Sequence, residues 1–215
     1  MDWILQIPIL LFSVVMHECA HGYTAYRCGD DTARLLGRIT LNPLPHLDPF
    51  GSVLLPLLLI ITNSNFLIAW AKPVPVNPRN FRNPTRDDIL VSVSGCAVNV
   101  LLAFAFTFCS IMTLVLLGRI PGLIPYGNVF LQMCLFGIWI NLILAIFNLI
   151  PIPPLDGSHI LRELLPHSTA VEYDRIGRYG FILLLLLVMT PLFSYVFLPA
   201  RIVFGLLKSL ILMFA

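Results

Sequence analysis

Charged residues are scarce in this 215-residue sequence: Asp, Glu, Lys and Arg together make up 11% of it, whereas hydrophobic residues make up 58%. A soluble domain carries about 25% charged residues, which it needs to cover a surface that faces water. The shortage of charge therefore excludes a soluble globular enzyme, and the apolar content excludes a disordered chain. The composition predicts an all-α polytopic membrane protein that is embedded in the lipid bilayer.

Two further absences narrow the class. No run of Lys or Arg is long enough to bind nucleic acid, and the net charge is only +2. The five cysteines are an odd number, and Cys19, Cys109 and Cys134 lie in apolar runs, where cysteine behaves as a small hydrophobic residue. We therefore expect no nucleic-acid partner, and free thiols rather than a disulfide framework.

Long apolar runs predict about four to six membrane segments in a single integral-membrane domain that covers residues 1–215. A helix needs about 20 mostly apolar residues to cross a bilayer. Four runs meet or approach that length, and a shorter apolar tail follows them, whose crossing the sequence leaves open. The runs are residues 3–26, 89–117, 129–150 and 181–198, and the tail is residues 202–215.

The stretch from residue 50 to residue 71 is predicted to enter the membrane and return. Its two apolar runs are separated by the polar residues 62–65, and neither run is long enough to span. The flanking loops, residues 27–48 and 72–88, are both rich in Lys and Arg, which is typical of cytoplasmic loops. A re-entrant hairpin over 50–71 places both loops on that side.

Two short segments, residues 37–43 and 72–78, are rich in β-branched residues and proline. Proline breaks helices and suits the edges of sheets. We therefore expect short β-like segments between the predicted membrane helices.

The first predicted span contains the motif His17-Glu18-Cys19-Ala20-His21. Histidines four residues apart lie one turn apart on one helix face, so both imidazoles reach the same metal ion. Glu18 lies about 100° around the helix from His17, within reach of a metal-bound water. Charged side chains inside a span are costly and mark function. The pattern predicts one catalytic Zn²⁺ per chain, and it argues against haem, whose two faces this pair cannot reach.

A zinc site needs a third protein ligand, and Asp156 is the candidate. Three prolines, Pro151, Pro153 and Pro154, end the third clear span and leave Asn148 and Asp156 near membrane depth. With a re-entrant hairpin, Asp156 reaches the same cytoplasmic half of the bilayer as the two histidines. The alternative is that Asp156 only caps a helix that begins at Gly157.

The His-Glu-x-x-His motif and the segment Asn148-Leu-Ile-Pro-Ile-Pro-Pro-Leu-Asp-Gly157 together resemble the site-2 protease family of intramembrane zinc metalloproteases. The segments GRITLNPLPHLDPFG (37–51) and WAKPVPVNP (70–78) resemble its compact prokaryotic branch, which lacks a PDZ domain. One departure is Cys96, which stands where the family usually has proline, between Gly95 and Asn99.

The resemblance implies that His17, His21 and Asp156 bind the zinc, that Glu18 is the general base, and that Asn148 positions or stabilises the scissile carbonyl. It also implies a membrane-spanning protein substrate, and an integral protein of the prokaryotic inner membrane with its active site toward the cytoplasm. The expected reaction is peptide hydrolysis inside the bilayer by a zinc-activated water.

Two hypotheses complete the functional interpretation. The segments around Ile39 and Val74 are candidates for binding the unwound substrate by strand addition. A non-enzymatic membrane carrier of metal ions or other cations, using the same His, Glu and Asp cluster, is the alternative function. Carriers often have broken helices in two repeated halves, and this sequence has no such repeat.

Overall fold

The computed structural model describes residues 3–54, 58, 61 and 70–214, and every regular element among them is a helix. The predicted all-α class is therefore confirmed. The α-helices are α1 (Trp3–Cys28), α2 (Thr32–Leu35), α4 (Pro84–Arg119), α5 (Ile124–Asn148), α6 (Asp156–Leu164), α7 (His167–Gly177), α8 (Gly180–Met189), α9 (Leu192–Val196) and α10 (Leu198–Leu212). Short 3₁₀ turns are η1 (Leu44–His46), η3 (Pro78–Asn80) and η4 (Pro121–Leu123), and η2 (Pro49–Leu54) is a π-helix.

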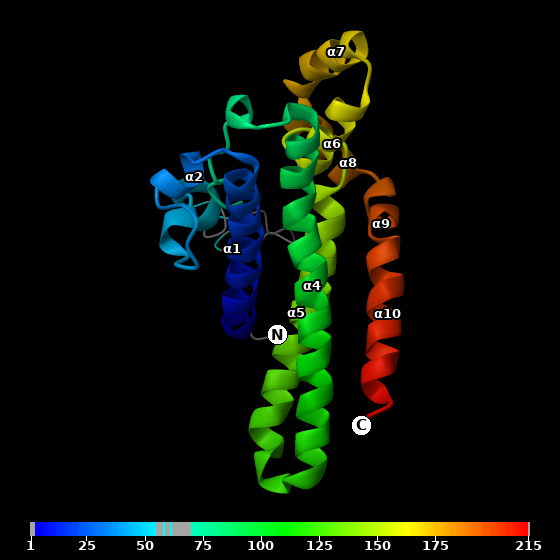
Figure 1. The fold of residues 1–215 in the computed structure, drawn as a ribbon. Helices are drawn as coiled ribbons and strands as arrows, with labels where there is room; N and C mark the ends of the chain where they lie inside the picture. The colour runs from blue at the N-terminus through cyan, green and yellow to red at the C-terminus, as the bar shows by residue number, and fades with distance from the viewer. Residues whose placement is uncertain (1–2, 55–57, 59–60, 62–69, 215) are drawn as a thin grey trace.

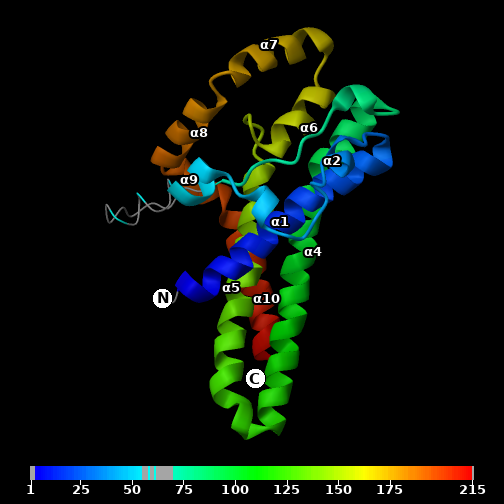
Figure 2. The same cartoon turned by 90° about the vertical axis from the view of Figure 1, so that its left-hand side faces the viewer.

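Three of the described helices are long and apolar enough to cross a membrane: α1 from Leu5, α4 and α5. They correspond to the first three predicted spans. Helices α4 and α5 form a long antiparallel hairpin, and α1 and α10 flank it (Figures 1 and 2). At about 1.5 Å per residue, the 36 residues of α4 extend ~54 Å, well beyond the ~30 Å of bilayer hydrocarbon.

The packing of α4 is typical of a membrane helix. Its buried side includes Ala103, which packs with Ile138 of α5 and Ala200 of α10 in the main apolar cluster. Its other side exposes large apolar side chains, of which Phe108 is 64% exposed. Small residues let membrane helices approach closely, whereas large ones face lipid at no cost.

The predicted fourth span, residues 181–198, is not one helix. Helix α8 ends at Met189, Thr190 is extended, and Pro191 begins a new turn. Because proline lacks the N–H that the preceding helix would need, the apolar run is divided there. The 10-residue α8 and the 15-residue α10, which includes most of the predicted tail, are both shorter than the ~20 residues of a full span.

The expected β-like segments form no strand among the described residues. Residues 37–43 and 72–77 are non-helical, Pro78 begins η3, and none of these residues has a partner strand among the described residues. Their prolines, Pro43, Pro73 and Pro75, cannot donate to a β-ladder, which explains why β-branched composition alone was misleading here.

Most of the predicted hairpin over 50–71 lies outside the described residues. Its two ends are described, and they meet: Trp70 N donates to Gly51 O at 3.2 Å, and Ser52 Oγ donates to Trp70 O at 2.7 Å.

The proline-rich loop after α5 is clamped by α7 and α8. Tyr173 Oη donates to Pro151 O at 3.0 Å. A Cβ added at Gly177 would lie 3.2 Å from Pro153 Cγ, and one added at Gly180 would collide with Pro153 O. These close approaches hold the loop from which α6 and Asp156 begin.

Candidate metal centre

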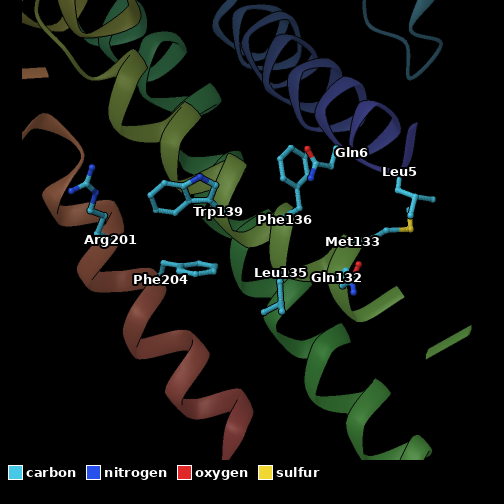
Figure 3. A pocket seen from close by; sticks show the side chains of 9 residues that line it. All are labelled: Leu5, Gln6, Gln132, Met133, Leu135, Phe136, Trp139, Arg201 and Phe204. Atoms are coloured by element: carbon cyan, nitrogen blue, oxygen red, sulfur yellow. The ribbon is translucent and has the colours of Figure 1, made fainter. Parts of the chain in front are cut away.

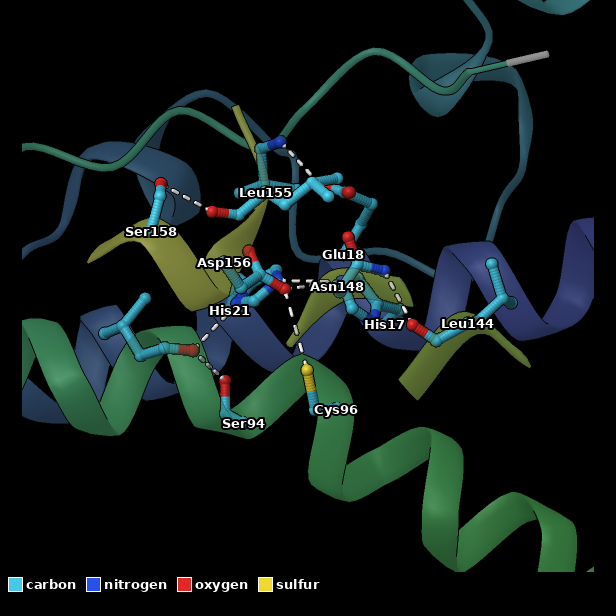
Figure 4. Close-up of polar contacts among 12 residues, drawn as sticks. His17, Glu18, His21, Ser94, Cys96, Leu144, Asn148, Leu155, Asp156 and Ser158 are labelled. Atoms are coloured by element: carbon cyan, nitrogen blue, oxygen red, sulfur yellow. Dashed lines mark hydrogen bonds and ion pairs between the residues drawn. The ribbon is translucent and has the colours of Figure 1, made fainter. Parts of the chain in front are cut away.

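Three side-chain atoms, two from the second half of α1 and one from the first turn of α6, converge at one place (Figure 4). His17 Nε2 and His21 Nε2 of α1 lie 3.0 Å apart. Asp156 Oδ2, from the first turn of α6, lies 3.2 Å from the first and 3.3 Å from the second. Both histidines are buried. The structure thus brings the three predicted ligands together.

The size of this triangle suits zinc. With Zn–N and Zn–O bonds of ~2.0–2.1 Å, tetrahedral ligands lie about 3.3 Å from one another. The three observed separations, 3.0 to 3.3 Å, are close to that value. Two imidazoles and one carboxylate are also a ligand set that catalytic zinc uses.

A hydrogen bond to a backbone carbonyl of α4 sets the tautomer of His21. His21 Nδ1 lies 2.8 Å from Val91 O. Because a carbonyl only accepts, Nδ1 carries the proton and the lone pair of Nε2 faces the triangle. In metal sites, a hydrogen bond from the far ring nitrogen of a histidine ligand to a carbonyl orients the ring and raises the basicity of the other nitrogen.

Gly95 lets α4 approach the two histidines. A Cβ added there would lie 2.6 Å from His21 Nε2 and 2.6 Å from His17 Cε1. No side chain fits in that space, so the triangle requires glycine at this position.

Asp156 is not the cap of α6. The N-cap is Leu155, no side chain caps the helix, and Asp156 lies in the first turn. The capping alternative is therefore wrong. The carboxylate is turned to the histidines instead, and the thiol of Cys96 donates to it over 3.9 Å.

Glu18 lies beside the triangle and is not one of its corners (Figure 4). Its Oε2 accepts a hydrogen bond of 2.7 Å from the backbone N–H of Val74. Asn148, at the end of α5, lies in the same region, and its Nδ2 donates to Leu144 O of its own helix at 3.0 Å. The catalytic roles of both residues remain predictions.

The two candidate substrate-binding residues, Ile39 and Val74, pack against α1. A Cβ added at Gly22 would lie 3.0 Å from Val74 Cγ1 and 3.2 Å from Ile39 Cγ1. Both therefore lie beside the helical turn that carries His21. Their role in binding a substrate remains a prediction.

Sequence reasoning missed three contributors to this site. The carbonyl of Val91 has no side-chain signature and could not be found from sequence. The same holds for the N–H of Val74 as the partner of Glu18. Gly95 had a usable signal, because it belongs to the Gly-x-x-x-Asn pattern that ends at Asn99.

A separate cavity of about 810 Å³ lies among α1, α5 and α10 (Figure 3). Its walls are mainly apolar, and its lining contains no member of the His-His-Asp triangle. The candidate metal centre therefore lies outside this cavity. The lining residues are Leu5, Gln6, Gln132, Met133, Leu135, Phe136, Trp139, Arg201 and Phe204.

The chain has clear relatives among known proteins. Residues 123–189 match Peptidase family M50. "Putative zinc metalloprotease YwhC" of Bacillus subtilis (strain 168) is 43% identical over 192 residues, which are 88% of this chain and 82% of that protein. The chain belongs to peptidase family M50, the site-2 protease family. "Putative zinc metalloprotease Rip2" of Mycolicibacterium smegmatis is 30% identical over 88% of this chain and 68% of its own length. No solved structure matches the chain.

Membership of family M50 confirms the resemblance and the enzyme class, a zinc metalloprotease. Together with the three helices of membrane-spanning length, it indicates an integral membrane protein. The matched residues include Asn148 and Asp156 but not the His-Glu-x-x-His motif.

Proposed function

We propose that this M50 protein is an intramembrane endopeptidase that hydrolyses peptide bonds in the transmembrane segments of protein substrates. One observation carries the proposal: a buried His-His-Asp triangle of zinc dimensions lies beside a carboxylate, Glu18, that is held outside it. A carrier site would have no need of a carboxylate kept apart from the ligands.

We assign zinc binding to His17, His21 and Asp156, with one Zn²⁺ per chain. Bound zinc lowers the pKa of a water molecule toward ~7 and polarises a carbonyl. The chain itself orients the ligands. The Val91 carbonyl fixes one imidazole, Gly95 makes room for both, and the clamped proline-rich loop presents the carboxylate.

Glu18 accepts the proton of the attacking water. Its position next to His17 on α1 brings it to the triangle, and the bond from Val74 N–H keeps Oε2 from turning toward the ligands. Asn148 stabilises the oxyanion: one amide hydrogen is used by Leu144 O, and the second is left to donate.

We propose that the centre faces the cytoplasmic side of a prokaryotic inner membrane. The meeting of Gly51 and Trp70 supports a re-entrant hairpin over 50–71, because the chain leaves and returns at one place. The Arg-rich residues 27–38 and the start of α4 lie at the same end of the molecule, opposite the α4–α5 turn (Figure 1). Such positive ends are typically cytoplasmic.

The test uses purified full-length protein in proteoliposomes, with zinc content and cleavage measured together. The substrate is a reporter panel of single transmembrane segments, each placed between two fluorescent proteins. We expect about one zinc per chain, less in Asp156→Ala, and cleavage of some reporters. Glu18→Gln should keep its zinc and lose about 10²–10⁴-fold in cleavage rate.

Two outcomes would overturn the proposal. A folded wild type that binds no zinc would leave the triangle without its metal. Uptake of zinc into the vesicles that depends on Glu18, with no reporter cleaved, would establish the carrier alternative.

A further inference from the structure

Residues 72–77 form a non-helical strap that runs beside the second half of α1. Its first residue is tied to the η1 turn, because Lys72 N donates to His46 O at 2.8 Å. Its last residue is tied to the turn that follows α1, because Asn77 N donates to the buried Asp30 Oδ2 at 2.7 Å. Between these anchors, Val74 N donates to Glu18.

The donor that reaches Glu18 is isolated by two prolines. Pro73 and Pro75 have no N–H, so Val74 supplies the one amide hydrogen between residues 72 and 76. A bond from an amide to a carboxylate is charge-assisted and about twice as strong as a neutral one. Among the residues that the structure describes, the carboxylate of Glu18 accepts one hydrogen bond, and its donor belongs to the peptide unit that joins Pro73 to Val74.

The other end of that peptide unit is held by Arg38. Arg38 Nη2 donates to Pro73 O at 3.2 Å and to Lys72 O at 2.9 Å. Pro73 O and Val74 N–H belong to the same planar group and point in opposite directions. A peptide whose carbonyl accepts from a cation is polarised and donates more strongly through its N–H.

Arg38 is unusually placed for a cation. The residue is about nine-tenths buried, and its Nε has no hydrogen-bond partner among the residues that the structure describes. Within that part of the chain it forms no ion pair with a carboxylate. Burying a charge without an opposite charge beside it is costly. The desolvation of Arg38 therefore offsets much of the stability that its hydrogen bonds contribute.

We propose that Arg38 is a positioning residue for Glu18, acting through the Pro73–Val74 peptide. Arg38 holds the carbonyl, the peptide transmits the constraint, and the N–H fixes the carboxylate beside the zinc ligands. The effect on catalysis rests on the proposed function, in which Glu18 is the base. The coupling between Arg38 and Glu18 is testable without any substrate.

The first experiment measures hydrogen exchange at the Val74 amide by mass spectrometry, on full-length zinc-loaded protein in detergent. Glu18→Ala and Arg38→Gln should each accelerate exchange about tenfold or more. The double variant should exchange no faster than the faster single variant, because both changes remove one constraint. The control is Arg34→Gln: Arg34 is an exposed arginine that pairs with Asp31 at 2.7 Å, and its loss should leave Val74 unchanged.

Unchanged Val74 protection in Arg38→Gln, or effects that simply multiply in the double variant, would overturn the proposal. If Arg38→Gln does not fold, Arg38→Lys replaces it. Lysine keeps the charge but offers a point donor instead of the planar fork, so it should give an intermediate exchange rate.

The second experiment measures cleavage of the reporter panel. Arg38→Gln should lower kcat about tenfold or more while KM and zinc content stay at wild-type values, and Arg38→Lys should recover part of the loss. Loss of zinc in parallel with activity would show a structural role only and overturn the proposal. If the wild type cleaves no reporter, the proposed function fails, and the exchange experiment still decides the coupling.

Discussion

His17 and Glu18 are neighbours on α1, yet different kinds of structure hold them. The metal triangle is held by helices: α1 and α6 supply its corners, and α4 approaches closely at Gly95. Glu18 is held by the backbone of a non-helical strap, far away in sequence. The proposed zinc binding and the proposed orientation of Glu18 as the base therefore depend on separate contacts, so each can be broken while the other is kept.

The largest effect on zinc affinity is expected from Gly95→Ala, which disturbs the triangle of His17, His21 and Asp156. The added methyl group would lie within 2.6 Å of both imidazoles and must displace them. We expect zinc affinity to fall about 10²-fold, the upper end of the range for changes around metal ligands, and cleavage to be lost as well. Competition with a chelator measures the affinity.

The matched control for that prediction is Gly118→Ala, on the same helix. A Cβ at Gly118 meets nothing within 4 Å. Alanine should therefore only improve helix propensity there, by up to ~1 kcal/mol, and zinc affinity should not change. Wild-type affinity in Gly95→Ala would mean that the histidines are not held as described.

Asp30→Asn should loosen the strap of residues 72–77. Asp30 accepts hydrogen bonds from Asn77 N, from Asn80 Nδ2 and from Thr32. The amide of asparagine points N–H groups at some of these donors, so the free energy of unfolding should fall by about 1–3 kcal/mol. We expect a lower Tm in detergent and faster Val74 exchange with about one zinc still bound. Loss of zinc with intact Val74 protection would contradict the separation of the two sets of contacts.

The same residue predicts how stability depends on pH. Burial raises the pKa of Asp30, but hydrogen bonds from Asn77, Thr32 and Asn80 lower it by more, so its pKa in the folded protein lies below the ordinary value. The unfolded chain then takes up the proton first. The contribution of Asp30 is complete above the ordinary pKa of about 4 and is lost as the pH falls through the folded value.

A series of Tm measurements from pH 6 downward checks this. Below about pH 4, the Tm of the wild type should fall further than the Tm of Asp30→Asn. Asp31→Asn is the control, since Asp31 is an exposed neighbour that pairs with Arg34. Parallel curves for the wild type and Asp30→Asn would show that Asp30 is not the group responsible.

The smallest effect is expected from Cys96→Ala, at the position where the family usually has proline. Its thiol reaches Asp156 Oδ2 only over 3.9 Å, and a thiol is a weak donor. Zinc affinity should therefore stay within about threefold of the wild type. The control is Cys134→Ala, which changes a buried cysteine on a different helix, α5, and should have an equally small effect. A tenfold loss restricted to Cys96→Ala would place the thiol among the groups that hold the metal.

Local sequence pattern was sufficient to predict α1, α4 and α5 and to name the three residues that the structure brings together as a candidate metal site. Apolar runs report membrane helices directly, and a spacing of four residues places His17 and His21 together. Asp156 was found because the prolines before it must end α5. The division of residues 181–198 at Pro191 was missed, because the hydropathy of that run outweighed a single proline.

Contacts between a side chain and a distant backbone group could not be predicted. Glu18 and Val74 are 56 residues apart, and the bond uses an amide that every residue except proline has. The expected strands at residues 37–43 and 72–78 failed for a related reason. β-Branched residues favour an extended chain, but a sheet also needs a partner with free donors, which a proline-rich segment lacks.

The clamp on the proline-rich loop determines how much chain a working centre needs. A fragment that ended at Leu165 would contain every residue assigned here to zinc or to proton transfer. It would lack Tyr173, Gly177 and Gly180, which hold the loop in front of Asp156. The minimal catalytic unit is thus set by the helices that brace the last ligand, and it extends some 25 residues beyond the last residue of the chemistry, to the start of α8.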